Sequence, residues 1–184
     1  MYCGSSKGAR PVYSEAAADL ADVLVRHDLE LVYGGAAKGL MGIIADKVLE
    51  LGGKAHGVIP QMLVEKEIAH EGLTQLHVVG SMHERKTMMA ALSDGFIAMP
   101  GGFGTLEEII EILTWAQLRF HDKPCGILNV RGYFDHLLSY LDHAQDEGFL
   151  RAANRRMLLA DEEAAGLVQQ FERYTAPHVE KWFE

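Results

Sequence analysis

The chain has 184 residues, of which 48% are hydrophobic and 23% are charged, a balance that suits one packed domain and argues against disorder. Its formal net charge of −9 repels nucleic-acid backbones and anionic membranes, so we expect no nucleic acid and no membrane among its partners. The two cysteines, Cys3 and Cys125, form no Cys-x-x-Cys pair, and the sequence has neither a bilayer-spanning apolar run nor a signal peptide, so we expect a single cytoplasmic domain over residues 1–184.

Short apolar segments alternate with longer amphipathic ones along the chain. This alternation predicts parallel strands joined by helical crossovers. The apolar segments lack polar alternation, as expected when both faces of a sheet are covered. The expected strands lie near 1–3, 29–33, 55–60, 75–79, 94–99, 124–130 and 157–160, and the expected helices near 11–27, 39–51, 81–93, 104–121, 133–147 and 161–174. The predicted fold class is α/β, a Rossmann-like three-layer α/β/α domain with a mostly parallel central sheet of about seven strands.

The first expected strand is unusually short. It contains only Met1-Tyr2-Cys3 before the turn at residues 4–6, whereas a central strand usually has about five or six residues. Two interpretations remain open: the numbering omits a few upstream residues, or the strand is genuinely short.

Glycine-rich or polar turns follow four of the expected strands. In open α/β sheets, ligands bind beyond the carboxyl ends of the strands, where glycine allows close backbone approach and the next helix offers N–H groups to an anion. One such turn often means only a tight bend, but four at the same topological place favour a phosphate site. None matches the dinucleotide fingerprint or a Walker A loop. The turns are residues 4–8, 34–39, 80–81 and 100–105.

The helix expected near 81–93 has an unusual charge pattern. Ser81 and Glu84 fit a capping box, which gives Glu84 a structural explanation. Arg85 and Lys86 oppose the helix macrodipole, which favours anions at that end. Arg85 also falls on the arc expected to be apolar, so it calls for a buried carboxylate or a bound phosphate, unless it snorkels to the surface. The same arc holds Met82, Met89 and Leu92.

The helix expected near 104–121 is apolar on two sides. Glu107 and Glu111 are interpreted as complements of the helix dipole. Glu108 shares the second apolar face with Ile112 and Trp115, and we expect another subunit to cover that face. A carboxylate there is partly desolvated, which is how acids are tuned for proton transfer. The expected core face contains Leu106, Ile109, Ile110 and Leu113.

Two longer motifs identify a family resemblance. Residues 100–108 match the pattern PGGxGTxxE, and residues 82–86 resemble a second pattern, M-H-x-R-K. Over residues 2 to about 150, the sequence resembles the Lonely Guy (LOG) proteins, the cytokinin riboside 5′-monophosphate phosphoribohydrolases. One departure is Ala36, where the family usually has a third glycine; alanine tolerates a positive φ poorly, so we expect altered phosphate contacts there. Shorter matches lie at residues 3–6, 33–35, 39–42, 57–60 and 114–118.

The resemblance implies a hydrolase that converts N6-substituted AMP to a free base and ribose 5-phosphate, and it implies a homodimer, with higher assembly left open. It implies that Arg85 and Glu108 form the catalytic pair. LOG-like proteins have also carried the label lysine decarboxylase, but no lysine here has the context of a pyridoxal phosphate Schiff base. The implied substrate-binding residues are Ser6, Gly34, Gly35, Glu67, Met82, Lys86, Gly101, Gly102, Phe103, Gly104, Thr105, Leu106, Glu107 and Thr114.

The expected chemistry needs no metal and no cofactor. The nine histidines show no metal-ligand spacing. We hypothesise an oxocarbenium-like transition state at the ribose C1′, with the phosphate on the N–H groups of residues 102–105. Glu108 stabilises the ribosyl cation or activates water, and Arg85 holds the phosphate or steers the ribose. The rival hypothesis is a non-catalytic nucleotide carrier of the same fold. The preferred base and the physiological role stay open.

Overall fold

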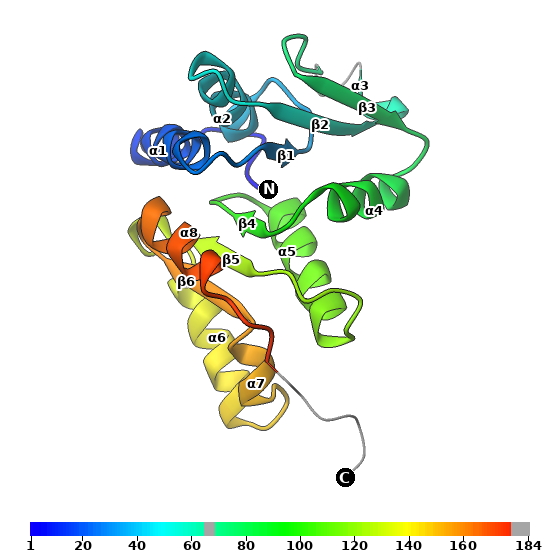
Figure 1. The fold of residues 1–184 in the computed structure, drawn as a ribbon. Coiled ribbons are helices and arrows are strands. Elements are labelled where there is room, and N and C mark those ends of the chain that lie inside the picture. Colours follow the sequence, from blue (N-terminus) through cyan, green and yellow to red (C-terminus); the bar gives the residue numbers. More distant parts are fainter. Residues whose placement is uncertain (65–68, 178–184) are drawn as a thin grey trace.

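The computed structural model describes residues 1–64 and 69–177, and its strands form two parallel three-stranded sheets (Figure 1). The first sheet has the order β1-β2-β3 and the second has the order β4-β5-β6. The predicted parallel α/β architecture is therefore confirmed. The strands are β1 (Leu31–Tyr33), β2 (Ala55–Pro60), β3 (Gln75–Val79), β4 (Phe96–Ala98), β5 (Cys125–Leu128) and β6 (Leu158–Asp161).

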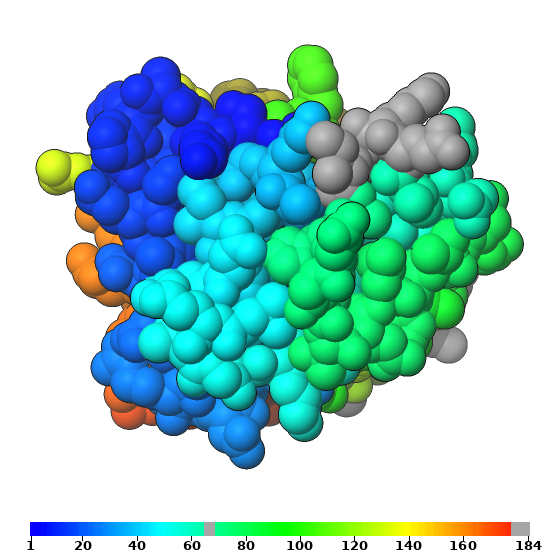
Figure 2. Space-filling view, turned by 90° about the horizontal axis from the view of Figure 1, so that it is seen from above, coloured from blue at the N-terminus to red at the C-terminus, as the bar shows by residue number. Residues whose placement is uncertain are grey.

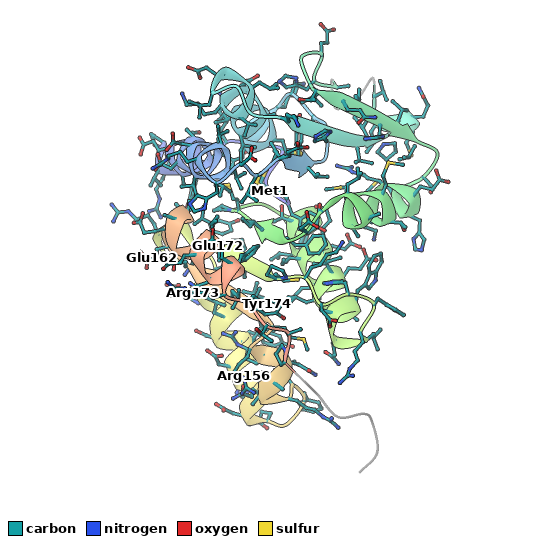
Figure 3. All side chains as sticks on the ribbon, viewed as in Figure 1. Met1, Arg156, Glu162, Glu172, Arg173 and Tyr174 are labelled. Atoms are coloured by element: carbon teal, nitrogen blue, oxygen red, sulfur yellow. The ribbon has the colours of Figure 1, made fainter. Side chains whose placement is uncertain are left out.

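The amino-terminal segment joins the two sheets. The Met1 amine donates to the Val32 carbonyl in the first sheet, and the Tyr2 N–H donates to the Ile97 carbonyl in the second at 2.9 Å. Figure 3 shows Met1 at the centre of the molecule, between the sheets. The expected seventh strand is wrong in detail: Tyr2 forms only an isolated bridge to Ala98, so the described residues contain six strands in two sheets.

Neighbouring residues of β1 and of β4 face opposite hydrophobic clusters, which lie on the two sides of the sheets and give the three layers. Leu31 and Tyr33 belong to one cluster with the helices α1, α2 and α8, whereas Val32 belongs to the other with α4, α5 and α6. In Figure 2, α1, α2 and β3 follow one another across one face. The long helices are α1 (Val12–Arg26), α2 (Gly39–Glu50), α4 (Met82–Leu92), α5 (Phe103–Gln117), α6 (Asp135–Asp146) and α8 (Ala164–Glu172).

Three short helical segments were not predicted, because each is only about one turn long. They are α3 (Gln61–Val64), η1 (Val130–Gly132) and α7 (Ala152–Arg155). No helix within residues 1–64 and 69–177 has the length and apolar character needed to cross a membrane.

The two faces of α5 differ from the prediction. Ile112, expected on the face covered by another subunit, lies in the core of this chain, whereas Ile110, expected in the core, is 39% exposed. A helix with apolar residues on two sides does not reveal from its sequence which side meets the sheet. The helix also ends at Gln117 instead of residue 121, because Arg119 adopts a positive φ of 64°. The buried residues of α5 are Thr105, Ile109, Ile112 and Ala116.

Candidate active site

The glycine turn after β4 leaves open space at the start of α5. A Cβ atom on Gly101 would lie 2.1 Å from Oγ1 of Thr105, so this turn requires glycine there for packing. At Gly102 and Gly104, by contrast, a Cβ atom would meet no described atom within 4 Å. The first N–H groups of an α-helix lack intrahelical acceptors. The start of α5 can therefore accept an anion at close range.

Two further turns meet this one at the carboxyl edge of the sheets. The Gly4 N–H donates to the Pro100 carbonyl at 3.0 Å, and the Gly4 carbonyl accepts from the Leu40 N–H at 3.1 Å. A Cβ atom on Gly39 would lie 2.2 Å from the carbonyl carbon of Ser5. The predicted gathering of the turns after residues 3, 33 and 99 is thus observed.

The departure at Ala36 does not strain its turn. The positive φ angles fall on Gly35 (79°) and Gly39 (64°), while Ala36 is buried and bridges Ala69. Altered phosphate contacts were expected because alanine tolerates a positive φ poorly. Ala36 does not adopt a positive φ, so this reason for expecting altered contacts no longer applies.

The start of α4 is capped as predicted. The Ser81 Oγ accepts from the Glu84 N–H at 3.1 Å, which confirms the cap. The Glu84 carboxylate, however, accepts from the Gly80 N–H at 2.9 Å. Glu84 thus has a structural role, because its backbone and its carboxylate both form hydrogen bonds that cap the start of α4.

Arg85 is buried, with 6% of its surface exposed, so the snorkelling alternative is wrong. Its Nη2 donates to the Gly34 carbonyl at 3.3 Å. A Cβ atom on Gly34 would lie 2.2 Å from that Nη2, so the guanidinium position requires glycine at residue 34. Within the described part of the chain, the Nε atom is buried without a hydrogen-bond partner, and no carboxylate forms an ion pair with Arg85. The guanidinium therefore has donor capacity left for a ligand.

Glu108 lies one turn into α5 and is partly buried. Burial raises the pKa of its carboxyl above the ordinary 4.5, and the nearby Arg85 charge acts in the opposite direction. The charge of Arg85 therefore acts on the Glu108 carboxyl, although the two side chains form no salt bridge in the described chain.

Lys86 joins α4 to α5. Its Nζ lies 2.7 Å from Oε1 of Glu107 and 2.9 Å from Oε2 of Glu111. The hydrogen bond to Glu107 is the largest influence and raises the pKa of the Lys86 amine. The interpretation of Glu107 and Glu111 as mere dipole complements is therefore wrong, because both bind a specific cation.

Comparison with known proteins decides the family. A family model described as "Possible lysine decarboxylase" matches residues 41–171. The Arabidopsis thaliana cytokinin riboside 5′-monophosphate phosphoribohydrolase LOG5 is 50% identical over 174 residues, covering 95% of this chain and 76% of its own. The chain belongs to the LOG family. The predicted resemblance is confirmed.

Solved structures share the fold of this LOG protein at low sequence identity. The protein TM1055 has a TM-score of 0.70 at 22% identity, with 95% of this chain and 100% of that chain covered. The molybdenum cofactor binding protein from Rippkaea orientalis has a TM-score of 0.66 at 20% identity, with 93% of each chain covered. These similarities confirm the Rossmann-like α/β architecture.

Two of the predicted substrate-binding residues of this LOG protein are not shown beside Arg85 and Glu108. Glu67 lies outside the described residues. Thr114 is exposed on α5 and donates to its own helix at the Ile110 carbonyl, 2.8 Å away. Six residues turn an α-helix by about 240°, so Thr114 and Glu108 point in different directions. Thr114 as a substrate contact stays a prediction.

The remaining predicted contacts surround the turns. Phe103 is 93% exposed beside the open space, whereas Thr105 is buried and Leu106 is partly buried. The exposed Ser6 accepts a hydrogen bond from the Gly8 N–H at 3.1 Å. Met82 lies with its sulfur 3.9 Å from Nη1 of Arg85.

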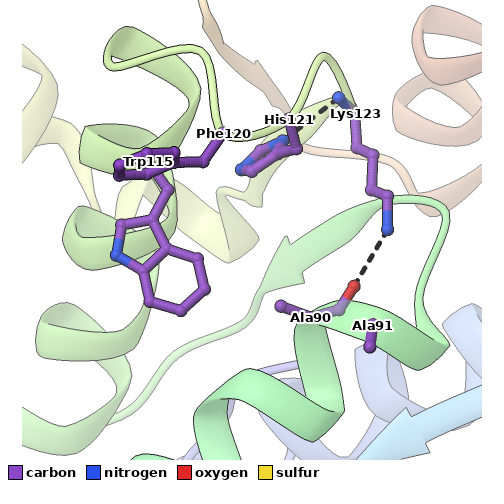
Figure 4. A pocket seen from close by; sticks show the side chains of 6 residues that line it. All are labelled: Ala90, Ala91, Trp115, Phe120, His121 and Lys123. Carbon is purple, nitrogen blue, oxygen red and sulfur yellow. Dashed lines mark hydrogen bonds between the residues drawn. The ribbon is translucent and has the colours of Figure 1, made fainter.

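An apolar pocket between the ends of α4 and α5 was not foreseen (Figure 4). Its volume is about 490 Å³, and the Lys123 Nζ closes one side by donating to the Ala90 carbonyl at 2.9 Å. The aromatic residues Trp115 and Phe120 were the sequence features that could have indicated this pocket. Phe120 lies beyond the end of α5, however, so it reaches the pocket only because the chain turns after that helix. Its lining consists of Ala90, Ala91, Trp115, Phe120, His121 and Lys123. Across residues 1–64 and 69–177, no three His, Cys, Asp or Glu side chains gather in a way that could hold a metal ion.

Proposed function

We propose that this LOG protein hydrolyses the N-glycosidic bond of adenosine 5′-monophosphate or an N6-substituted derivative. Water adds to C1′ of the ribose, the bond from C1′ to the base breaks, and the products are the free base and ribose 5-phosphate. One observation carries the proposal: the buried Arg85 retains an unpartnered Nε atom and acts electrostatically on the partly buried carboxyl of Glu108. A site that only captured phosphate would not need that carboxyl. The activity of the relative LOG5, as its name gives it, supports the same reaction.

The phosphate binds at the start of α5 in this proposal. The open space in front of Gly102 and Gly104 lets an anion reach the N–H groups of residues 102–105. Phosphate at this end is favoured by the helix dipole, which overrides the negative net charge of the chain locally. The contacts predicted for Ser6, Gly34, Gly35, Met82 and Lys86 belong to the same proposal.

Glu108 and Arg85 act on the ribose. As C1′ gains positive charge, the Glu108 carboxylate stabilises the ribosyl cation or accepts a proton from the attacking water. Arg85 holds the phosphate or steers the ribose and the carboxylate. The departing base takes up a proton as its bond to C1′ breaks.

The test is direct product analysis. The protein is incubated with AMP and with N6-isopentenyl-AMP, and the free base and ribose 5-phosphate are quantified. We expect the two products in equal amounts and a fall of about 100-fold or more in kcat for Glu108→Gln or Arg85→Ala. The exposed Glu15→Gln serves as the matched control. Wild-type turnover in Glu108→Gln contradicts the proposed residues, whereas nucleotide binding without base release favours the carrier hypothesis. A panel of nucleoside monophosphates then identifies the preferred base.

Lysine decarboxylation is not part of the proposal. A Schiff base requires a neutral lysine amine as nucleophile. Lys86, the lysine nearest the proposed pair in sequence, is held by two carboxylates that raise its pKa and keep it protonated.

We also propose that the protein is a cytoplasmic homodimer. The outer sides of α4 and α5 and the turn after α5 expose large apolar side chains, and the pocket of Figure 4 opens among the same elements. Exposed apolar patches of this kind mark interfaces. In this proposal, a second copy covers Ile110, which α5 exposes on the side opposite its buried residues. Both cysteines are buried and free, which suits a reducing compartment. The exposed residues are Met82, Leu92, Ile110, Leu118 and Phe120.

A further inference from the structure

The Tyr133 hydroxyl donates a hydrogen bond to the Gly101 carbonyl at 2.7 Å. The two residues are 32 positions apart, and Tyr133 follows β5 whereas Gly101 follows β4. Tyr133 therefore reaches the proposed phosphate turn from the neighbouring strand. It is not part of either motif that identified the family.

The segment that carries Tyr133 is firmly built. Its backbone passes through positive φ angles at Arg131 (53°) and Gly132 (71°). The buried Asn129 amide donates to the Asp135 carboxylate at 2.8 Å and accepts from the Phe134 N–H at 2.7 Å. These bonds fix the tight turn and leave little freedom for the residue at its apex.

The ring of Tyr133 is held from two sides. It packs edge to face against Tyr13, with centroids 5.7 Å apart, and against Phe134, with centroids 5.0 Å apart. The side chain is still 43% exposed, so aromatic packing does not bury it in the core. Its hydroxyl is thereby aimed at one acceptor, the Gly101 carbonyl.

The peptide between Gly101 and Gly102 benefits from such an anchor. A peptide flanked by two glycines rotates easily, because neither residue has a Cβ atom to restrict it. The preceding carbonyl, of Pro100, is already held by the Gly4 N–H. In a trans peptide the C=O and N–H groups point in opposite directions, and the described chain contains no cis peptide. A Gly101 carbonyl fixed toward Tyr133 therefore fixes the direction of the Gly102 N–H.

We propose that Tyr133 is a positioning residue, whose hydroxyl locks the Gly101–Gly102 peptide so that the Gly102 N–H is presented to the 5′-phosphate. This inference rests on the proposed function, because it assigns the phosphate to the start of α5. Tyr133 acts through the turn and takes no part in proton transfer. Its loss weakens phosphate affinity and leaves the chemical step intact.

The test compares Tyr133→Phe with Tyr13→Phe, which removes a hydroxyl from the ring packed against Tyr133. We measure kcat and KM for AMP, and we titrate ribose 5-phosphate and adenosine by calorimetry. For Tyr133→Phe we expect KM for AMP and Kd for ribose 5-phosphate to rise about three- to tenfold, the worth of one hydrogen bond. We expect kcat to stay within about twofold and the Kd for adenosine, which has no phosphate, to stay unchanged. Tyr13→Phe should match wild type throughout.

Several outcomes overturn the inference. They are an unchanged Kd for ribose 5-phosphate in Tyr133→Phe, an equal loss for adenosine, or an equal loss in Tyr13→Phe. Failure of wild type to bind ribose 5-phosphate also overturns it. Failure of the proposed function is separate: wild type then releases no base, while the calorimetric difference between the two variants persists.

Discussion

Lys86 on α4 binds Glu107 on α5, and these two residues are the chain neighbours of Arg85 and Glu108. Lys86 also forms an ion pair with Glu111. Together the two ion pairs link α4 to α5 beside the proposed catalytic residues. Arg85 and Glu108 form no salt bridge of their own within the described chain, so the Lys86 ion pairs are the charged tie between α4 and α5 beside them.

Glu111→Gln should weaken the tie without touching a predicted substrate contact. We expect kcat to fall about two- to fivefold as α4 and α5 lose their fixed spacing. We expect the free energy of unfolding to change by less than about 1 kcal/mol, because the Glu107 branch remains. Kinetics and urea unfolding measure the two effects. Lys47→Met, which breaks the exposed Lys47–Glu50 pair within α2, is the control. Identical kcat values for both variants contradict a positioning role for Glu111.

Glu108→Gln should show a stability gain that depends on pH. Burial raises the pKa of Glu108 in the folded protein, whereas the unfolded chain titrates near 4.5. Between these two values the folded state holds a proton that the unfolded state has released, so rising pH removes stability through Glu108. The gain from Glu108→Gln should therefore be small below pH 4.5 and larger at neutral pH. Urea unfolding of both proteins at pH 4 and 7 measures this difference. A gain that is equal at both pH values argues against the raised pKa.

Gly104→Ala should separate stability from activity. The added Cβ atom meets no described atom within 4 Å, and alanine favours the helix by about 0.5 kcal/mol or more over glycine. We therefore expect an unchanged or slightly higher melting temperature. The methyl group, however, occupies the space proposed for phosphate, so KM for AMP should rise at least about tenfold. Thermal melts and steady-state kinetics measure both. Unchanged KM places the phosphate elsewhere.

Sequence patterns predicted local features of the candidate site but not the side-chain contacts that join its segments. Helical spacing predicted the Ser81–Glu84 cap and the burial of Arg85. It was wrong for Met82 and Leu92, which were expected on the same apolar arc and are 41% and 44% exposed. The Lys86 tie and the Tyr133 hydrogen bond did not, because each joins segments more than 20 residues apart through side chains that look ordinary at the surface. The side of α5 that packs on the sheet also could not be predicted from the spacing of its apolar residues. Apolar residues lie on both sides of this helix, so the sequence pattern does not determine its rotation.

Gly34→Ala should displace the Arg85 guanidinium without removing its charge. The new Cβ atom would lie 2.2 Å from Nη2, and the end of a flexible side chain can move away at modest cost. We expect kcat/KM to fall about tenfold or more with little loss of thermal stability. Kinetics of Gly34→Ala, Arg85→Ala and the double variant test the mechanism. If Gly34 acts through Arg85, the double variant should be no worse than Arg85→Ala alone. Additive losses indicate that Gly34 acts independently.

Ile110→Glu should disrupt the proposed homodimer. Ile110 is 39% exposed on α5, opposite the buried face of that helix, and a charge there opposes burial against a second copy. Light scattering coupled to gel filtration should show a dimer for wild type and a shift toward monomer for Ile110→Glu. Phe149→Glu is the matched control, because Phe149 is 90% exposed after α6 and lies outside the apolar surface of α4 and α5. Dissociation by Phe149→Glu alone places the interface near α6. A monomeric wild type removes the homodimer from the proposal.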